Sequence, residues 1–333
     1  MNNGMIKFDR APKIAASYSC VGSEEKKGPI GECFAYFSED NKFGKDTWEK
    51  AESEMQRIAL LGAMQRAGIN DTGLDILLAG DLLNQCVGSS FGLLDYDIPY
   101  VGLYGACSTC ALGIALGACL ISGGIAERVG AVTSSHYCSS ERQFRYPLEY
   151  GGQRAPTAQW TVTGAGAFIL GNRGKVSIPE AVFGKSKDMG IKDINNMGAA
   201  MAPSCKETIK TYFEESSHSP ADFDMIITGD LGYEGSEILK ELLLDEGIDI
   251  RKNHADCGLM IYDRESQDKH AGGSGCGCSA SVISAHILKR LEACELKDVL
   301  FIGTGALMNS LTMCQGESIP AISHLVRLKR EEE

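Results

Sequence analysis

The chain has 333 residues, of which 44% are hydrophobic and 23% are charged, so it is long and apolar enough to bury a sizeable core. Its formal net charge of −12 argues against non-specific binding to nucleic acid or to an anionic membrane surface. No apolar run approaches the roughly 18 residues of a membrane-spanning helix, and the N-terminus lacks a signal-peptide core, so we predict a soluble protein without a signal peptide.

The first long helix is predicted between residues 48 and 64, where apolar residues recur at helical spacing. Asp46 and Glu49 are placed as a capping pair at its start, and Gly68 is placed to end it. A short apolar segment with the sequence DILLAGDL follows at residues 75–82. It is typical of a strand buried on both faces.

The next predicted helix, over residues 108–122, is opened by the sequence YGACSTC. Cys107 therefore stands at a helix N-terminus, where unpaired backbone N–H groups and the helix dipole favour a thiolate or a bound anion. A strand over residues 128–134 comes next, and a long aromatic and charged loop then reaches Gly152. Such loops within a compact fold are usually functional or interfacial.

The same order of elements recurs later in the chain, which indicates an internal duplication. The sequence DMIITGDL at residues 224–231 matches the earlier DILLAGDL, and it again follows a predicted helix, at residues 197–215. We expect Asp81 and Asp230, which follow the repeated glycine, to cap turns. A helix start rich in glycine and cysteine at residues 275–279 matches the region of Cys107.

A turn-rich break with the sequence GNRG at residues 171–174 separates the two copies. We therefore predict an α/β fold of two similar halves packed as a pseudo-dimer, with largely parallel sheets covered by helices. The N-terminal half would span residues 1–173 and carry Cys107, and the C-terminal half would span residues 174–333.

Thirteen cysteines in a chain without a secretory signal predict reduced thiols. Two close pairs, Cys107 with Cys110 and Cys276 with Cys278, could in principle ligate zinc. Structural zinc sites usually pair two tighter knuckles or add histidines at fixed offsets, and Cys110 would lie almost one turn past Cys107 within a helix, so we predict no metal site.

The chain resembles the thiolase and ketoacyl synthase superfamily over nearly its whole length. The resemblance rests on GACS before the central helix, on TGAGAFIL at residues 163–170 and on IGTGAL at residues 302–307. It implies a thiolase-like fold with α/β/α/β/α layers. It also places Cys107 where those enzymes carry the acyl-accepting cysteine.

The partner residues of that superfamily are missing from the matching positions. Where a proton-transferring residue is expected in the second half, the chain reads TGDL at residues 228–231, and aligning the later glycines places Gly273 rather than His270 at the next position. Condensation needs an activated nucleophile, stabilisation of an oxyanion and proton transfer. We therefore predict a binding protein rather than an enzyme; the alternative is an acyltransferase that uses Cys107 with His136 or His270.

Longer motifs resemble the stage V sporulation protein AD family, a non-catalytic branch of the superfamily. They are SSHYCSSERQFRYPLEYGGQ at residues 134–153, DFDMIITGDLG at residues 222–232 and DVLFIGTGALMN at residues 298–309. The resemblance implies a component of the sporulation and germination system that moves dipicolinic acid, usually as its calcium chelate, across the spore inner membrane. It also implies membrane-embedded partner proteins from the same operon and a location in the forespore or spore, peripheral to that membrane.

Dipicolinate is a flat dianion, and we expect it to bind beside Cys107, where several N–H groups can reach one carboxylate. A protein of charge −12 repels a free dianion at long range, so the calcium chelate, or a dianion shielded by local cations, would approach more easily. We predict no other cofactor. The predicted ligand-binding residues are Cys107, Ser108, Ser135, His136, Arg142, Gly273 and Ser274.

Several alternatives stay open at this point. His136 could be a structural histidine, and Arg142, like Arg145, could pair with a glutamate of its own loop. Superfamily members commonly pair through the edge strand beside the cysteine helix, so the resemblance allows a homodimer. A structural adaptor that docks to membrane partners and needs no ligand is a third hypothesis beside the binding protein and the acyltransferase.

Overall fold

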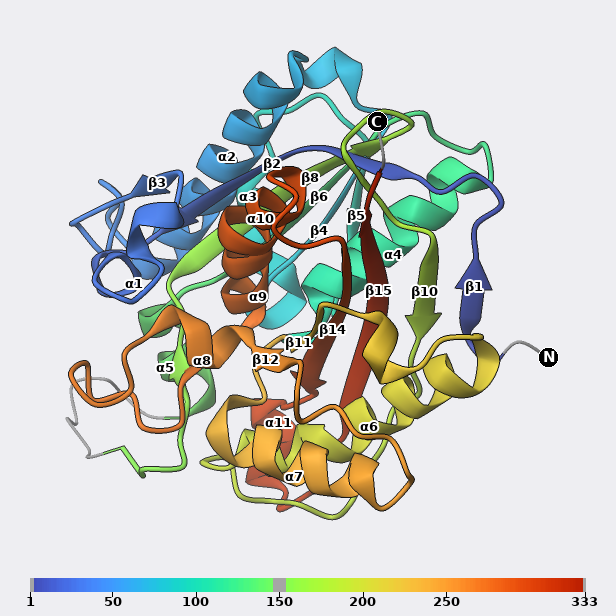
Figure 1. Ribbon diagram of the computed structural model, residues 1–333. Coiled ribbons are helices and arrows are strands. Elements are labelled where there is room, and N and C mark those ends of the chain that lie inside the picture. Colours follow the sequence, from blue (N-terminus) through green and yellow to red (C-terminus); the bar gives the residue numbers. More distant parts are fainter. Residues whose placement is uncertain (1–2, 146–153, 332–333) are drawn as a thin grey trace.

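Thirteen strands form one mixed sheet in the computed structural model, which describes residues 3–145 and 154–331 (Figure 1). Two more short strands, β7 (Trp160–Thr161) and β13 (Gly273–Ser274), pair with each other in parallel. The strands of the large sheet are β1 (Met5–Lys7), β2 (Lys13–Val21), β3 (Tyr36–Phe37), β4 (Ile76–Gly80), β5 (Tyr100–Gly102), β6 (Val129–Ser135), β8 (Gly164–Gly171), β9 (Val176–Ser177), β10 (Glu180–Phe183), β11 (Met225–Thr228), β12 (His254–Asp256), β14 (Asp298–Ala306) and β15 (Ala321–Arg330).

The strand order repeats between the two parts of the sheet. One end runs β5-β4-β6-β8-β2 and the other runs β12-β11-β14-β15-β10, so equivalent strands occupy equivalent places. In both, the first three strands are parallel and the next is antiparallel. The short strand β9 pairs with both β2 and β15 and thereby joins the two ends. The α/β prediction is confirmed, but the expectation of largely parallel sheets is wrong, because seven of the twelve strand pairings described in the large sheet are antiparallel. The boundary at residue 173 stays a prediction.

Helices cover the two parts of the sheet and also fill the space between them. In Figure 1, α2 lies at the top, α6 and α7 lie at the bottom, and α4, α9 and α10 lie between. The helices are α1 (Ser23–Lys26), α2 (Trp48–Ala67), α3 (Val87–Gly92), α4 (Thr109–Ser122), α5 (Tyr137–Phe144), α6 (Met197–Glu215), α7 (Gly232–Leu244), α8 (Cys257–Ile261), α9 (Cys276–Val282), α10 (Leu288–Glu292) and α11 (Ser310–Cys314), with a π-helical turn at Ile283–Ile287 between α9 and α10.

The predicted long helices agree with the structure, but two local details differ. Helix α2 is capped by Thr47, whose hydroxyl accepts a hydrogen bond from the Lys50 amide, and not by Asp46. It ends at Gly68 as predicted, with a positive φ of 67°. The loop expected from residue 134 to 152 contains helix α5, and its part from residue 146 to 152 lies outside the described residues.

The central helices pack closely on the sheet because small residues face it. Gly277 of α9 lies against β8 and β6, and a Cβ atom there would stand 2.2 Å from the Gly164 oxygen and 2.6 Å from the Ser135 nitrogen. Gly113 of α4 has more room, because its Cβ would lie 3.6 Å from the Ala131 Cβ atom. Helix α9 therefore lies too close to the sheet for a Cβ atom at Gly277, whereas helix α4 leaves room for one at Gly113.

Replacing Gly277→Ala should destabilise the protein by about 1–3 kcal/mol, because the helix must move away from the β8 backbone. The matched change Gly113→Ala should be neutral or stabilise by up to about 1 kcal/mol, because alanine favours a helix interior. Urea unfolding of both variants measures the difference. Equal stability of the two variants would contradict the packing argument.

Candidate functional site

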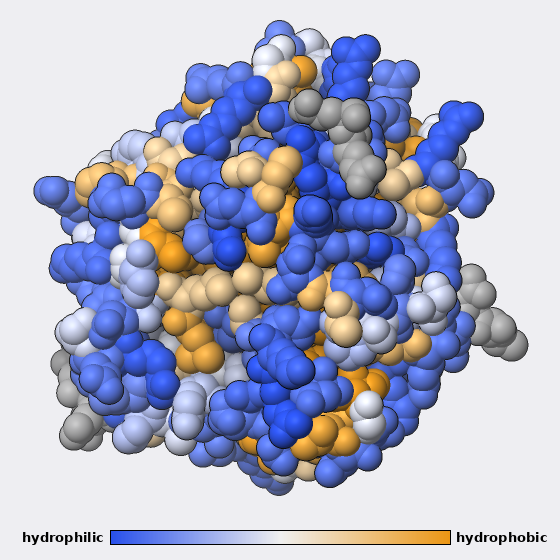
Figure 2. Space-filling view, in the orientation of Figure 1, coloured by the Kyte–Doolittle hydropathy of each residue, from blue (hydrophilic) through white to orange (hydrophobic). Residues whose placement is uncertain are grey.

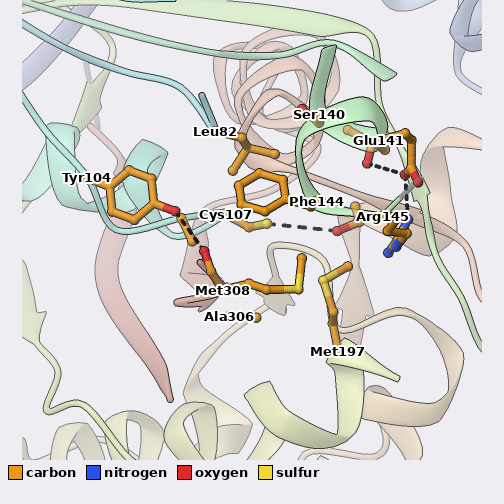
Figure 3. Close-up of a pocket in the computed structure, with 13 residues that line it drawn as sticks. Leu82, Tyr104, Cys107, Ser140, Glu141, Phe144, Arg145, Met197, Ala306 and Met308 are labelled. Carbon is orange, nitrogen blue, oxygen red and sulfur yellow. Dashed lines mark hydrogen bonds and ion pairs between the residues drawn. The ribbon is translucent and has the colours of Figure 1, made fainter. Parts of the chain in front are cut away.

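A narrow pocket lies beside Cys107, and it is lined by the segment before α4, by helix α5 and by residues near β7, β13 and β14 (Figure 3). Its cavity volume is about 30 Å³, which is room for about two water molecules. The lining residues are Leu82, Tyr104, Ala106, Cys107, Ser140, Glu141, Phe144, Arg145, Thr161, Met197, Ser274, Ala306 and Met308.

Cys107 reaches the pocket through a strained turn. Ala106 has a positive φ of 48°, which is unfavourable for a residue with a Cβ atom. Helix α4 begins at Thr109, two residues after the cysteine. The amides of Ser108 and Thr109 donate to the carbonyls of Gly105 and Ala106, at 3.1 and 3.2 Å. The expectation that amides beside Cys107 would be free for an anion is therefore wrong for these two.

A buried carboxyl group, Asp230, lies behind Cys107 and determines the state of its thiol. Asp230 accepts hydrogen bonds from the Ser274 hydroxyl at 3.0 Å, the Gly275 amide at 2.9 Å and the Thr304 hydroxyl at 2.7 Å. The Cys107 sulfur lies 3.9 Å from the Ser274 hydroxyl. Burial and, next, the charge of Asp230 raise the pKa of Cys107 well above its ordinary value. The expected thiolate is therefore corrected to a protonated thiol, and Asp230 is a buried hydrogen-bond centre rather than a simple turn cap.

The opposite wall of the pocket carries a buried ion pair and two unpartnered polar atoms. Arg145 pairs with Glu141 of α5, and only 4% of the Arg145 side chain is exposed. The Thr161 hydroxyl also donates to Glu141, at 3.0 Å. Among residues 3–145 and 154–331, the Arg145 Nε atom and the Ser140 hydroxyl are buried without a hydrogen-bond partner. Both residues line the pocket, so these two donors are available to a polar ligand (Figure 3).

Of the seven residues predicted from sequence to bind a ligand, Cys107 and Ser274 line the pocket. Ser108 and Ser135 are buried and bonded elsewhere: their hydroxyls donate to the carbonyls of Gly105 at 2.6 Å and Val162 at 2.7 Å. Ligand contact by any of the seven stays a prediction.

The other three predicted residues also lie outside the pocket lining. His136 is fully buried, and its ring accepts the Cys138 amide at 3.2 Å and contacts the Asn41 carbonyl at 2.7 Å, as in its structural alternative. Arg142 pairs with Glu49 rather than with a glutamate of its own loop. The Gly273 carbonyl accepts a hydrogen bond from the Gln159 side chain at 3.0 Å.

Sequence analysis missed most of the pocket wall, and helix α5 explains why. Once residues 137–144 are helical, Ser140, Glu141, Phe144 and Arg145 share one face, and Arg142 points away from it. The segment had been interpreted as a loop, in which Arg142 and Arg145 are equivalent. A test for helical spacing in this segment could have favoured Arg145.

The histidines, which most often catalyse proton transfer, lie outside the pocket. None of the six histidines lines the pocket. His270, the second candidate base, is exposed and pairs with Asp268 at 2.8 Å. Among residues 3–145 and 154–331, no three His, Cys, Asp or Glu side chains are grouped to hold a metal ion.

Two further buried carboxyl groups, Glu52 and Asp81, lie under helix α5. Glu52 accepts hydrogen bonds from the hydroxyls of Ser134 at 3.0 Å and Ser139 at 2.9 Å. Burial and then the charge of Asp81 raise the pKa of Glu52 to about 8, so it stays protonated at neutral pH. Asp81 is held by the amide and hydroxyl of Ser89, at 2.7 and 2.6 Å.

Comparisons with known proteins match this architecture. The model of the stage V sporulation protein AD family matches residues 2–329. The chain is 41% identical to Stage V sporulation protein AD of Bacillus subtilis (strain 168), over 97% of this chain and 96% of that protein.

Similar solved structures are condensing enzymes. A 3-oxoacyl-[acyl-carrier-protein] synthase III from Aquifex aeolicus has a TM-score of 0.56 at 12% identity, covering 96% of this chain and 99% of that one. Cerulenin-bound OleA from Xanthomonas has a TM-score of 0.62 at 12% identity, covering 97% and 98%. At this identity the likeness shows the fold, and the predicted thiolase-like fold is confirmed.

Replacing Asp230→Asn should make Cys107 more reactive towards iodoacetamide, because removing the negative charge lowers the pKa of the thiol. Peptide mass spectrometry at mildly alkaline pH measures the rate of alkylation. The exposed Cys294 provides an internal control whose rate should not change. A Cys107 rate that stays constant or falls would contradict the role assigned to Asp230.

Replacing Glu52→Gln should weaken the pH dependence of stability. The folded protein keeps the Glu52 proton up to about pH 8, whereas an unfolded glutamate releases it near its ordinary pKa of 4.5. The folded state binds more protons in this window, so the free energy of unfolding falls as pH rises through it. Urea unfolding at about pH 5 and about pH 9 should show the variant gaining stability relative to the natural chain only at the higher pH. A parallel pH profile for both proteins would count against a protonated Glu52.

Proposed function

Because the chain belongs to the stage V sporulation protein AD family, we propose that it is a non-enzymatic sporulation protein that binds dipicolinic acid in the pocket between Cys107 and Arg145. The observation that carries this proposal is the pair of donors, Arg145 Nε and the Ser140 hydroxyl, which have no partner among the described residues and lie in the wall that also carries Phe144. A flat aromatic dicarboxylate supplies both an acceptor for these donors and a ring for the apolar surface.

The charges of the site define how such a ligand would lie. Asp230, behind Cys107, repels a carboxylate, whereas Arg145 attracts one. A carboxylate of the ligand would therefore face Arg145 and Ser140, and the ring would lie among Phe144, Met197 and the neighbouring apolar residues. Methionine side chains adapt readily to a ligand, which suits a pocket that is narrow when empty.

The same charges support binding over catalysis. A nucleophilic cysteine needs a base that removes its proton, and the group beside Cys107 is an acid whose charge keeps the proton on sulfur. The fold is shared with condensing enzymes, so acyl transfer through Cys107 is the second candidate function. The strained turn at Ala106, which presents the cysteine to the pocket, is the observation in its favour.

Calcium would act through the ligand rather than through a site of the protein. A protein of net charge −12 attracts Ca²⁺ and repels a free dianion at long range. The calcium chelate avoids this repulsion, and the free dianion can be bound once it reaches Arg145. We propose both as ligands and no other cofactor.

Partner proteins would find an apolar surface close to the pocket. Among the described residues, the edge strand β5 pairs only with β4, and it exposes Tyr100 and Val101. Phe91 and Leu94 are also exposed, at 65% and 71%. We propose that membrane-embedded proteins of the same operon or a second copy of the chain cover this surface, at the spore inner membrane during dipicolinate transport and germination.

The described helices themselves include none that is long and apolar enough to cross a membrane. On the face shown in Figure 2, hydrophobic residues form separate patches between hydrophilic ones. Membrane association would therefore use protein partners.

Isothermal titration calorimetry with sodium dipicolinate, with and without calcium, tests the proposed function. The natural chain should bind, and Arg145→Gln combined with Glu141→Gln should weaken binding about tenfold or more, because the ligand loses its charged donor. The double change removes both charges of the buried pair and so leaves no unpaired charge. Arg251→Gln removes the same charge from an exposed arginine that pairs with Asp249 and does not line the pocket, and it should bind like the natural chain.

Absence of binding in both calcium conditions would overturn the proposal. Stoichiometric labelling of Cys107 by an acyl-coenzyme A analogue, detected by peptide mass spectrometry, would favour the acyltransferase instead. Protection of this thiol from alkylation by dipicolinate would support binding.

A further inference from the structure

A cluster of cationic side chains surrounds Trp160, next to the pocket. The Lys269 Nζ atom lies 3.4 Å from the centroid of the Trp160 ring, and the guanidinium carbon of Arg154 lies 4.8 Å from it. Tyr137 stacks on the same indole with its ring centroid at 3.9 Å. Lys269, Arg154 and Tyr137 therefore all contact the ring of Trp160.

Strand β7 separates this cluster from the pocket. Neighbouring residues of a strand point to opposite faces, so Thr161 lines the pocket and Trp160 faces the cluster. Arg145 connects the two sides, because it lines the pocket and its Nη1 atom lies 3.5 Å from the Gln159 carbonyl, next to Trp160.

The cations of the cluster lack matching negative charge. Lys269 is only 6% exposed, and within the described part of the chain neither it nor Arg154 forms an ion pair. The Arg154 Nη2 atom donates to the backbone carbonyl of Asp268 at 2.6 Å, and its Nη1 atom is buried with no hydrogen-bond partner among the residues that the structure describes.

The nearby carboxylates either pair with other cations or are held in a state that favours the proton. Glu25 is fully buried, and burial raises its pKa. Asp268 pairs with His270 at 2.8 Å, and Glu24 pairs with Lys27 at 2.7 Å. Glu141 pairs with Arg145. Among the described residues, Glu141 is therefore the one carboxylate that pairs directly with any of the three cations Arg145, Arg154 and Lys269, and it pairs with Arg145.

The positive charges of the cluster also repel one another. Burial and then the charge of Arg154 lower the pKa of Lys269. Burial also lowers the pKa of Arg154, and Arg145 contributes in the same direction. Buried cations without counter-charge are costly, and a bound anion of charge −2 would remove most of the cost.

We propose that Arg154 and Lys269 form a second anion-binding subsite, beside Trp160, which takes a small dianion such as a dicarboxylate or phosphate and passes it to Arg145 at the pocket. The dicarboxylate as natural occupant rests on the proposed function, whereas the anion site itself does not. In a chain of net charge −12, such a subsite concentrates an anion where the long-range field repels it.

Tryptophan fluorescence can test this subsite directly. The chain has two tryptophans, so Trp48→Phe leaves Trp160 as the single reporter. Sodium dipicolinate and inorganic phosphate are titrated separately as probes, and calorimetry with dipicolinate runs in parallel. We expect a saturable change in Trp160 emission, because an anion draws Lys269 away from the indole ring.

In the Trp48→Phe background, Lys269→Met and Arg154→Gln should each weaken this transition about tenfold or more. Arg154 is less buried than Lys269, so its variant keeps the test valid if Lys269→Met misfolds. Arg251→Gln removes the same charge from an exposed side chain that pairs with Asp249, and it should leave the transition unchanged.

The outcomes separate the subsite from the proposed function. Calorimetric binding of dipicolinate with unchanged Trp160 emission for both probes, or equal affinity in Lys269→Met, Arg154→Gln and their parent, would overturn the subsite and leave the pocket intact. A Trp160 transition with phosphate but no binding of dipicolinate would support the subsite and contradict the proposed function.

Discussion

The buried carboxyl group of Asp230 is the contact on which the site depends. It follows strand β11 and is bonded by Ser274 and Gly275, at the start of α9, and by Thr304 of β14. Three segments distant in sequence thus meet at one group behind Cys107. Its hydrogen bonds fix the backbone of the pocket, and its charge adds to the larger effect of burial in raising the pKa of Cys107.

This arrangement differs from what a nucleophilic cysteine needs, which is a base that removes its proton. The comparison structures share the fold at 12% identity, and Cys107 faces a pocket directly after Ala106, whose φ is positive. In place of a basic partner, the chain has an acid at the floor and an arginine at the wall. A protonated thiol and a buried cation recognise polar ligands without needing to transform them, which is consistent with a scaffold adapted to binding.

Sequence analysis predicted the repeated architecture well, because the signal lies in local patterns. Helix α6 spans residues 197–215 as predicted, and Gly68 ends α2 in the left-handed conformation that glycine favours. The role of Asp230 could not be predicted in this way, because its three partners come from two segments far away in sequence. The choice of Arg145 over Arg142 depended on recognising α5 as a helix, and its short polar sequence gives only a weak helical pattern.

The narrowness of the pocket has a consequence for regulation. A cavity of about 30 Å³ cannot hold an aromatic dicarboxylate, so binding requires a more open state in which α5 or the methionines move. The measured affinity is then the intrinsic affinity multiplied by the fraction of molecules in that open state. A neighbouring protein that docks near α5 and stabilises the open state would raise the affinity without touching the ligand, and one that stabilises the closed state would promote its release.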